Sequence, residues 1–261
     1  MCGMQNEVSS RSWAVIQSLV IVSLSLCFTF TAHADFASIR VVTELSPPHQ
    51  MMKEGKVDGF STQIVEAILK NAGLNSRIEV YPWARAFYIA SSTPNVLIYN
   101  MARTPERENQ FHWIGPVAKY SFGLVRLADR TDLTPNHVKD LGSAVIAVQR
   151  GDFSGQWLQQ QGMKEGKELQ FSADILESWN LLLKGKVDYV IDDKAALPYM
   201  EQQLTLVPGT TRFVLAIPQL EQQTYLAASK NSDSALVKKL QQAHREVQKT
   251  NIYQYVISGG F

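Results

Sequence analysis

The stretch that decides the fold of this chain reads Asn95-Val-Leu-Ile-Tyr-Asn-Met-Ala-Arg-Thr-Pro-Glu-Arg-Glu108. Its apolar part, Val96–Tyr99, has the length and composition of a buried β-strand. The following Thr104-Pro105-Glu106 is typical of a helix start, because Thr suits the N-cap, Pro the first helical position and Glu the first turn. The sequence therefore predicts a strand that leads directly into a helix.

Arg107 is unusual in this position, because the helix macrodipole places partial positive charge on the first turn. A cation beside free backbone N–H groups, just past the end of a strand, indicates a pocket for an anion. The alternative is that Arg107 folds outward and pairs with Glu106, Glu108 or water. These residues alone leave both interpretations open.

Residues 1–34 are typical of a secretion signal. Arg11 precedes an apolar stretch over 13–31, and Ala32-His33-Ala34 supplies the small-x-small pattern of a cleavage site. The mature chain would then begin at Asp35 and contain 261 − 34 = 227 residues. An uncleaved membrane anchor is the alternative, but the stretch is near the lower length limit for a span and contains several polar residues.

The mature chain is expected to have no disulfide and no thiol nucleophile, because Cys2 and Cys27 both lie in the signal segment. Leu26 is larger than the residue that usually precedes a lipidated cysteine, so we do not expect lipid attachment. Without Arg11 and Glu7, the 25 basic and 24 acidic residues become 24 and 23, a net charge of +1. This balance argues against a nucleic-acid partner, which would require a basic stripe.

Strand-like and helix-like segments alternate along the mature chain, in two series separated near residue 130. This alternation predicts an α/β fold with parallel sheets that are covered on both faces. The expected strands are 39–43, 78–80, 95–101, 144–148, 169–171, 189–191, 213–217 and 225–228. The expected helices are 61–72, 84–90, 153–161, 175–183, 194–203, 233–249 and 252–257.

Five short motifs occur in a fixed order along these segments. They are Gly59-Phe60, Thr104-Pro-Glu-Arg107 with Phe111 and Gly115-Pro116, Gln149-Arg-Gly-Asp-Phe153, Gly185-Lys-Val-Asp-Tyr-Val-Ile-Asp-Asp193 and Leu226-Ala-Ala-Ser-Lys230. In this order the chain resembles family 3 of the extracellular solute-binding proteins, the periplasmic receptors that serve polar amino-acid ABC transporters. Pro82-Trp-Ala-Arg-Ala86 is similar to a subgroup of that family.

The resemblance implies a two-lobed α/β fold of the periplasmic-binding-protein type II class, with a hinge of two segments. Lobe 1 would comprise 35–122 and 219–261, and lobe 2 would comprise 123–218. The extended segments 117–127 and 213–217 fit the hinge. Such proteins close their lobes around a ligand by hinge motion.

By the same resemblance, Arg107 falls on the arginine that binds the ligand carboxylate, and a guanidinium offers a carboxylate a planar, bidentate fork. Arg103 is a nearby basic alternative. Asp193 falls on the acidic residue that receives the ligand's amino group, at a strand end where α/β sheets bind ligands. The alternative is that Asp193 or Asp192 caps the helix that begins at Lys194.

Other positions of the family's site also have counterparts here. Asn100 and Ala102 lie where the family uses a strand end for contacts. Asp152, Phe153 and Ser154 lie on the loop that offers N–H donors from the second lobe, although Asp152 replaces a common hydroxyl residue and could instead cap its helix.

The first loop and the Pro82–Ala86 motif add further candidates. Glu44 could face the pocket and favour a cationic ligand group. Trp83 and Arg85 could line the cleft, with interlobe packing equally open for Trp83. His49 could stack on the ligand or lie in solvent.

We therefore expect a monomeric periplasmic protein without metal or cofactor. It would capture a small polar carboxylate or amino-acid-like solute by lobe closure and deliver it to a membrane ABC permease. One alternative is an enzyme like the periplasmic cyclohexadienyl dehydratases, which act on prephenate or arogenate, with Asp193, Glu44 or His49 as acid or base. Another is a ligand-sensing partner of a membrane histidine kinase.

Overall fold

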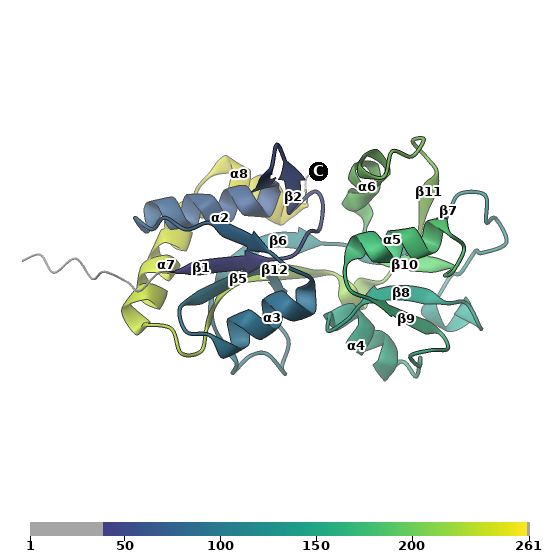
Figure 1. Cartoon of the computed structure of the whole chain (residues 1–261), viewed down its shortest axis with the longest axis horizontal. Helices are drawn as coiled ribbons and strands as arrows, with labels where there is room; N and C mark the ends of the chain where they lie inside the picture. The colour runs from purple at the N-terminus through teal and green to yellow at the C-terminus, as the bar shows by residue number, and fades with distance from the viewer. Residues whose placement is uncertain (1–38, 260–261) are drawn as a thin grey trace, which may run out of the picture. The chain divides into compact units, whose positions relative to one another are not determined.

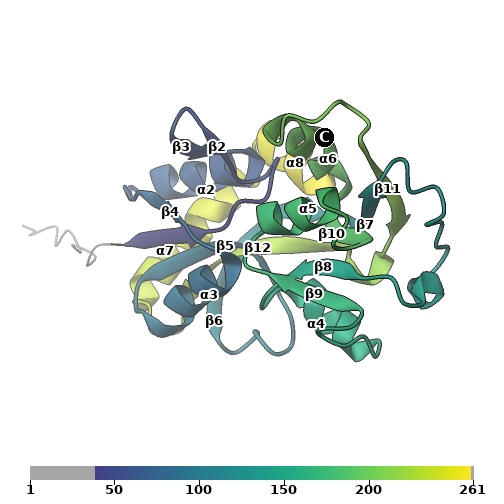
Figure 2. The same ribbon diagram turned by 45° about the vertical axis from the view of Figure 1, so that its right-hand side comes forward.

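The computed structural model describes residues 39–259, and the predicted signal segment 1–34 lies outside the described residues. Two five-stranded sheets organise the chain (Figures 1 and 2). The predicted two-lobed α/β fold is confirmed. Among residues 39–259, no helix combines the length and apolar character that crossing a membrane requires.

The first sheet has the strand order β4-β1-β5-β12-β6, and α2 and α3 lie on its opposite faces (Figure 1). Its strands are β1 (Arg40–Thr43), β4 (Ile78–Val80), β5 (Val96–Ala102), β6 (Phe111–Tyr120) and β12 (Gln222–Ser229). Its helices are α2 (Phe60–Asn71), α3 (Trp83–Ser92), α7 (Ser234–Val247) and α8 (Asn251–Ser258). A hairpin of β2 (Met51–Lys53) and β3 (Lys56–Asp58) precedes α2.

The second sheet has the order β11-β7-β10-β8-β9, with α4 and α5 on opposite faces (Figure 1). Its strands are β7 (Phe122–Leu127), β8 (Ile146–Gln149), β9 (Leu169–Ser172), β10 (Tyr189–Asp193) and β11 (Thr211–Ala216). Its helices are α4 (Phe153–Gln160), α5 (Ile175–Leu183) and α6 (Leu197–Gln203), with short 3-10 helices η1 (Val138–Leu141), η2 (Lys194–Ala196) and η3 (Pro218–Leu220).

The cores follow from the two-residue period of the strands. In β10, Tyr189 and Ile191 pack into one cluster with Leu158 of α4. The intervening Val190 packs into a second cluster with Trp179 of α5. Because successive strand side chains point to opposite faces, a strand that is apolar at every position requires helices on both sides.

Both sheets are mixed, so the expectation of parallel sheets holds for only part of each: β1 pairs parallel with β4 and β5, and β8 with β9 and β10. β12 pairs antiparallel with β5 and β6, and β7 pairs antiparallel with β10 and β11. These antiparallel strands are the ones that adjoin the passages between the sheets. The chain leaves the first sheet at Ser121, between β6 and β7, and returns through residues 217–221, between β11 and β12. The predicted lobe limits, 35–122 with 219–261 and 123–218, stay a prediction.

The helix predicted to begin at Thr104 is not present. Residues 105–110 form turns, in which the Arg107 N–H donates to the Thr104 carbonyl (3.0 Å) and the Gln110 N–H to the Arg107 carbonyl (3.0 Å). β6 begins directly afterwards at Phe111 and runs antiparallel to β12, so this segment is a connection between sheet strands. The Thr-Pro-Glu signal therefore marks a turn here, a role that the same residue types also favour.

Candidate functional site

A cavity of about 30 Å³ lies among the strand ends of both sheets. Residues of both sheets line it: Glu44, Ser46, Trp83, Asn100, Ala102, Tyr120, Phe122, Gln149, Asp152, Phe153, Ser154, Ile175, Ile191, Asp192 and Thr224. The carboxyl ends of β1, β5, β8 and β10 all reach it, as expected for ligand sites of open α/β sheets.

Seven of the ten predicted site residues line this cavity, namely Glu44, Trp83, Asn100, Ala102, Asp152, Phe153 and Ser154. The lining does not include Arg107, Asp193 or Arg85. Arg85 is exposed on α3, and its guanidinium lies 5.8 Å from the Tyr88 ring centroid. The structure therefore brings most, but not all, of the predicted residues together.

Arg107 is buried, with 4% of its surface exposed, and does not fold outward. Its guanidinium donates to the Ala102 carbonyl (3.3 Å) and the Gly151 carbonyl (3.0 Å). It also lies 5.5 Å from the Trp83 ring centroid and 5.1 Å from that of Phe87. Burial lowers the pKa of Arg107 from its ordinary value. A guanidinium held by carbonyls and aromatic faces is fixed in position while it keeps its charge.

Arg103, the basic alternative, lies in a different environment. It forms a two-point ion pair with Glu108, at 2.7 and 2.5 Å, and 41% of its side chain is exposed. Its guanidinium also faces the Trp113 and Tyr225 rings. Because Arg103 is already paired at the surface, Arg107 is the better candidate for an anion anchor.

The carbonyl of Gly151 joins the two lobes. It accepts from the Trp83 indole N–H (3.0 Å) as well as from Arg107. Trp83 begins α3 beside the first sheet, whereas Gly151 follows β8 of the second, and the Gln149 amide likewise donates to the Glu44 carboxylate. Trp83 therefore fulfils both alternatives, since it lines the cavity and bonds across the lobes.

Asp193 is engaged by backbone amides. Its carboxylate accepts from Ser121 N–H (2.7 Å), between β6 and β7, and from Ala195 N–H (2.7 Å), where it caps η2. Burial raises the pKa of Asp193. These contacts support the capping alternative and hold β10 to the first passage between the sheets, while a contact of Asp193 with a ligand stays a prediction.

Asp192 lines the cavity and was considered from sequence only as a helix cap. The Trp179 indole N–H donates to one of its oxygens (2.7 Å) and the Asp193 backbone N–H to the other (2.7 Å). Burial raises the pKa of Asp192 to about 7. The doubled Asp at the end of a predicted strand was the signal that could have identified it.

Asp152 caps α4, as one alternative anticipated, because its carboxylate accepts from the Ser154 backbone N–H (3.3 Å) and from the Ser154 hydroxyl. It also lines the cavity. His49 is fully buried, and its ring lies 4.3 Å from that of Tyr120. The solvent alternative for His49 was therefore wrong. Burial lowers the pKa of His49 to about 3, so the ring is neutral at pH 7.

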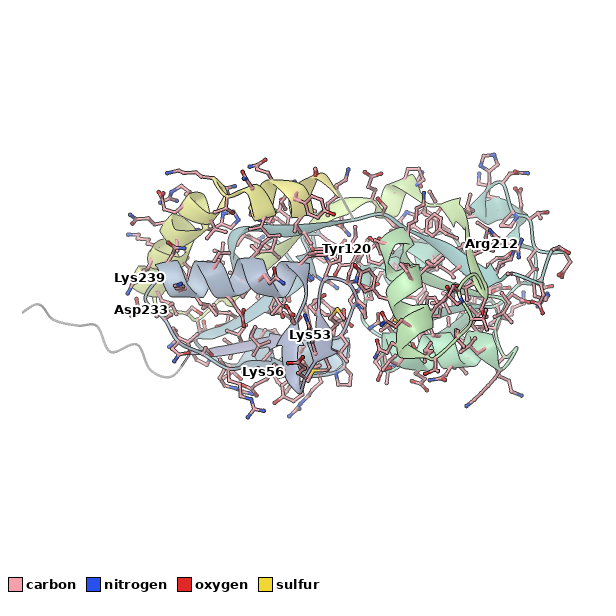
Figure 3. The ribbon with its side chains drawn as sticks, turned by 90° about the horizontal axis from the view of Figure 1, so that it is seen from above. Lys53, Lys56, Tyr120, Arg212, Asp233 and Lys239 are labelled. Carbon is pink, nitrogen blue, oxygen red and sulfur yellow. The ribbon has the colours of Figure 1, made fainter. Side chains whose placement is uncertain are left out.

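Sequence reasoning did not identify Tyr120, which is central to the polar wall of the cavity. Figure 3 shows Tyr120 between the two sheets. Its hydroxyl accepts from the Asn100 amide (3.0 Å) and donates to the Gln50 amide oxygen (3.1 Å). Asn100 also donates to the Ser61 hydroxyl (3.0 Å) and accepts from the Thr224 hydroxyl (3.1 Å). Such a satisfied network fixes the orientation of the side chains that carry it.

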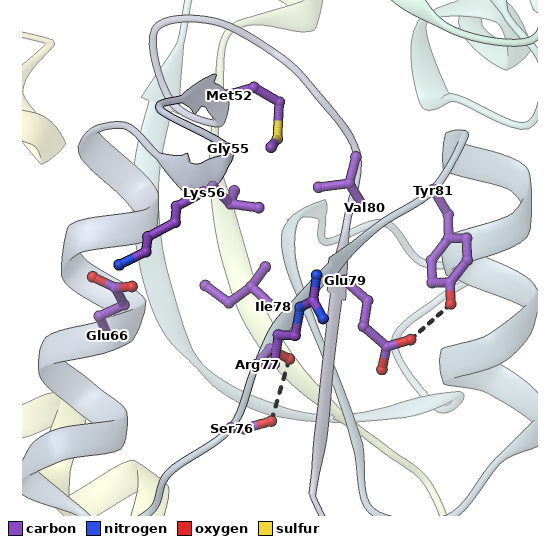
Figure 4. A pocket seen from close by; sticks show the side chains of 11 residues that line it. Met52, Gly55, Lys56, Glu66, Ser76, Arg77, Ile78, Glu79, Val80 and Tyr81 are labelled. Carbon is purple, nitrogen blue, oxygen red and sulfur yellow. Dashed lines mark hydrogen bonds between the residues drawn. The ribbon is translucent and has the colours of Figure 1, made fainter.

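A larger groove of about 890 Å³ lies elsewhere, between the β2–β3 hairpin and β4 (Figure 4). Its Glu79 carboxylate accepts from the Tyr81 hydroxyl (2.7 Å) and forms a two-point ion pair with Arg40. The groove contains none of the predicted site residues. We therefore place the candidate site in the smaller cavity.

The acidic wall of the cavity predicts a pH dependence of folding. Burial, followed by repulsion from Asp152, raises the pKa of Glu44 from 4.5 to about 8. Between these values the folded chain retains a proton that the unfolded chain has lost, so the free energy of unfolding falls as pH rises through this window. Urea unfolding at pH 5, 7 and 9 should show this loss, and Glu44→Gln should reduce it. If the free energy of unfolding of Glu44→Gln fell with pH as steeply as that of the natural protein, Glu44 would not be the source of the pH dependence.

The profile of the bacterial extracellular solute-binding proteins, family 3, matches residues 39–257. A search of curated proteins finds no match. A solved histidine kinase sensor domain with similarity to periplasmic binding proteins has 18% identity and a TM-score of 0.73, covering 85% of this chain and 94% of its own.

Two solved amino-acid-binding proteins share the same fold. An ancestral arginine-binding protein bound to arginine has 24% identity and a TM-score of 0.73, covering 86% of this chain and 98% of its own. The arginine-, lysine-, histidine-binding protein ArtJ from Geobacillus stearothermophilus has 22% identity and a TM-score of 0.70, covering 85% of this chain and 96% of its own.

Proposed function

Because the chain belongs to family 3 of the bacterial extracellular solute-binding proteins, we propose that it captures a small amino-acid-like solute between its lobes in the periplasm. The solute is then delivered to a membrane ABC permease. The observation that carries the proposal is the cavity at the strand ends of both sheets, two of whose lining residues, Ala102 and Trp83, contact the buried Arg107 guanidinium. The amino-acid ligands of the arginine-binding protein and ArtJ support the same class of solute.

In this proposal Arg107 binds the solute carboxylate. The carbonyls of Ala102 and Gly151 take two of the five N–H donors of the guanidinium, and other donors can form the fork that a carboxylate requires. Asp193 receives the amino group, and the backbone N–H groups at the start of α4, at Phe153 and Ser154, supply further donors. Asn100 and Ala102 form the wall of the first lobe.

Capture requires the lobes to separate. A cavity of about 30 Å³ is far smaller than the roughly 300 Å³ or more of typical ligand pockets. The passages at Ser121 and at residues 217–221 are the two places where the chain crosses between the sheets, so they are the natural hinge. Opening would separate Gly151 from Trp83 and Arg107, and closure would restore these bonds around the solute.

A sensory role is the second candidate, supported by the likeness to a histidine kinase sensor domain. The same closed lobes would then be presented to a membrane receptor. A pull-down with solute present, from membranes that contain the permease or the kinase, separates the two roles according to which component is retained.

We predict a large thermal shift on ligand addition. A ligand present at one hundred times its dissociation constant stabilises the fold by about 2.7 kcal/mol. For a chain of this size that corresponds to a rise in melting temperature of roughly 5–10 °C. The measurement is a thermal-shift screen of amino acids, polyamines and small organic acids, on protein that has been unfolded and refolded to remove bound solute.

The same screen tests the enzyme alternative. A compound that stabilises the protein and is recovered unchanged supports capture, whereas turnover of prephenate or arogenate would identify a dehydratase. No shift with any member of the panel would contradict the proposed function.

A further inference from the structure

We propose, on the basis of the proposed function, that the solute carries a positive charge in addition to its α-amino group. This charge lies among Glu44, Asp152 and Asp192. The cleft is the proposed binding site on other grounds, so the inference concerns only the charge of the group that it accepts. The solute would thus be an amino acid with an ammonium or guanidinium side chain.

The charges along the cavity wall have one sign. Glu44 follows β1 of the first lobe, whereas Asp152 and Asp192 belong to the second, so carboxylates approach the cavity from both sides. The residues that line the cavity include no Lys, Arg or His. A cationic group placed between the lobes would therefore meet opposite charge on each wall.

The three carboxylates are bonded to neutral donors. Glu44 accepts from the Gln149 amide, Asp152 from Ser154, and Asp192 from the Trp179 indole and a backbone N–H. In the described part of the chain, the ion pairs within 4.0 Å include none of the three. These bonds orient the carboxyl groups and bring no positive charge to them.

A count of charges leads to the same result. Arg107 interacts electrostatically with Asp152 and Glu44, and it is assigned to the solute carboxylate. Asp193 is assigned to the α-amino group. A neutral amino acid would therefore bring no cation that stabilises the ionised forms of Glu44, Asp152 and Asp192, and burial would keep the pKa of Glu44 at about 8 and that of Asp192 at about 7. A second cation on the solute would stabilise these ionised forms.

The remaining wall also favours a cation. Trp83, Tyr120, Phe122 and Phe153 line the cavity, so aromatic rings share its wall with the carboxyl groups. The rings of Tyr120 and Phe122 are stacked, with centroids 4.9 Å apart and an angle of 9°, and that of Phe153 meets Phe122 edge-on at 5.7 Å. Aromatic faces attract ammonium and guanidinium groups through the ring quadrupole.

A metal ion does not fit this wall. Among residues 39–259, no three His, Cys, Asp or Glu side chains converge in a way that could hold one. Carboxyl groups that come from two lobes and share a cavity with aromatic rings suit a larger, organic cation.

The test compares solutes that differ only in this charge. L-arginine is paired with L-citrulline, and L-lysine with L-norleucine, which have nearly the same shape but a neutral side chain. Calorimetric titration at pH 8.5, where Glu44 and Asp192 are ionised, should show that the cationic member of each pair binds about 100-fold more tightly. Equal or tighter binding of citrulline and norleucine would overturn the inference and leave the proposed function standing.

A substitution of Glu44 tests whether this residue of the cavity wall causes the preference for a cationic solute. Glu44→Gln keeps the size of the side chain and should reduce the ratio of the affinity for arginine to that for citrulline about tenfold. Glu246→Gln, which removes an exposed carboxylate of α7 paired with Lys249, should leave the ratio unchanged. A ratio that is unchanged in both variants would remove Glu44 from the site and overturn the assignment.

Two further outcomes separate this inference from the proposed function. Putrescine, a diamine without a carboxylate, binding as tightly as lysine would support the cationic wall and contradict the carboxylate anchor. No binding of any of these compounds, or of other amino acids, would overturn both.

Discussion

Replacing Arg107 with alanine is expected to weaken binding of a carboxylate-bearing solute by about 2–5 kcal/mol, or roughly 30-fold to several thousand-fold. Arg107 has 4% of its surface exposed, and its guanidinium carbon lies 5.5 Å from the Trp83 ring centroid and 5.1 Å from that of Phe87. In such surroundings a charge-assisted, bidentate hydrogen bond is stronger than it is in water. Calorimetry with the best solute from the thermal-shift screen measures the loss.

Two controls make this result interpretable. Arg103→Ala removes the neighbouring cation, which is paired with Glu108 at the surface, and should leave affinity nearly unchanged. Arg107→Lys keeps the charge but loses the planar fork, so its affinity should fall between those of the natural protein and Arg107→Ala. If Arg103→Ala weakened binding and Arg107→Ala did not, the anchor would be Arg103.

The segment around Arg107 illustrates what the local sequence could and could not predict. The predicted strand that ends before Arg107 is confirmed as β5, although the helix that was meant to supply the free N–H groups is a series of turns. Thr, Pro and Glu favour both structures. Only the pairing of β6 with β12, more than a hundred residues away in sequence, decides between them.

Segments with a strong period were predicted well. The helix expected at 175–183 is α5 with the same bounds, because its buried Ile175, Trp179 and Leu182 share one face and Asp174 caps it. The hairpin β2–β3 is absent from the predicted strands, because its three-residue strands are too short to show an alternation. Strand direction was not predictable, since local pattern is nearly the same in parallel and antiparallel strands with two buried faces.

The candidate site likewise contains residues that the sequence predicted and residues that it did not. Residues at strand ends, such as Asn100 and Ala102, were located from the motifs because a strand end points into the cleft of any sheet of this kind. Tyr120 and Asp192 were missed as wall residues because their roles depend on the side chains opposite them. The Tyr120 hydroxyl meets Asn100 and Gln50, and Asp192 meets the indole of Trp179, contacts that no local pattern encodes.

Gly59→Ala is expected to cause the largest loss of stability, about 3 kcal/mol or more, with a fall in melting temperature of roughly 10 °C. Gly59 has a φ of 119°, and a Cβ there would lie 2.4 Å from the His49 carbonyl oxygen and 2.6 Å from that of Pro48. Those two carbonyls accept the first N–H groups of α2, at distances of 3.1 to 3.3 Å, where no side chain caps the helix. The methyl group would therefore strain the backbone and also displace the cap.

Gly73→Ala serves as a reference, because Gly73 lies just beyond the other end of the same helix. Gly73 also has a positive φ, 58°, but nothing lies within 4 Å of its Cβ position. Backbone strain alone should cost about 1 kcal/mol. Thermal unfolding of both variants therefore measures how much more the Gly59 site loses, through its contact and its φ of 119° together. Equal losses of stability in the two variants would show that the loop of Pro48 and His49 moves aside at little cost. The cavity wall formed by Ser46 and Tyr120 would then not depend on Gly59.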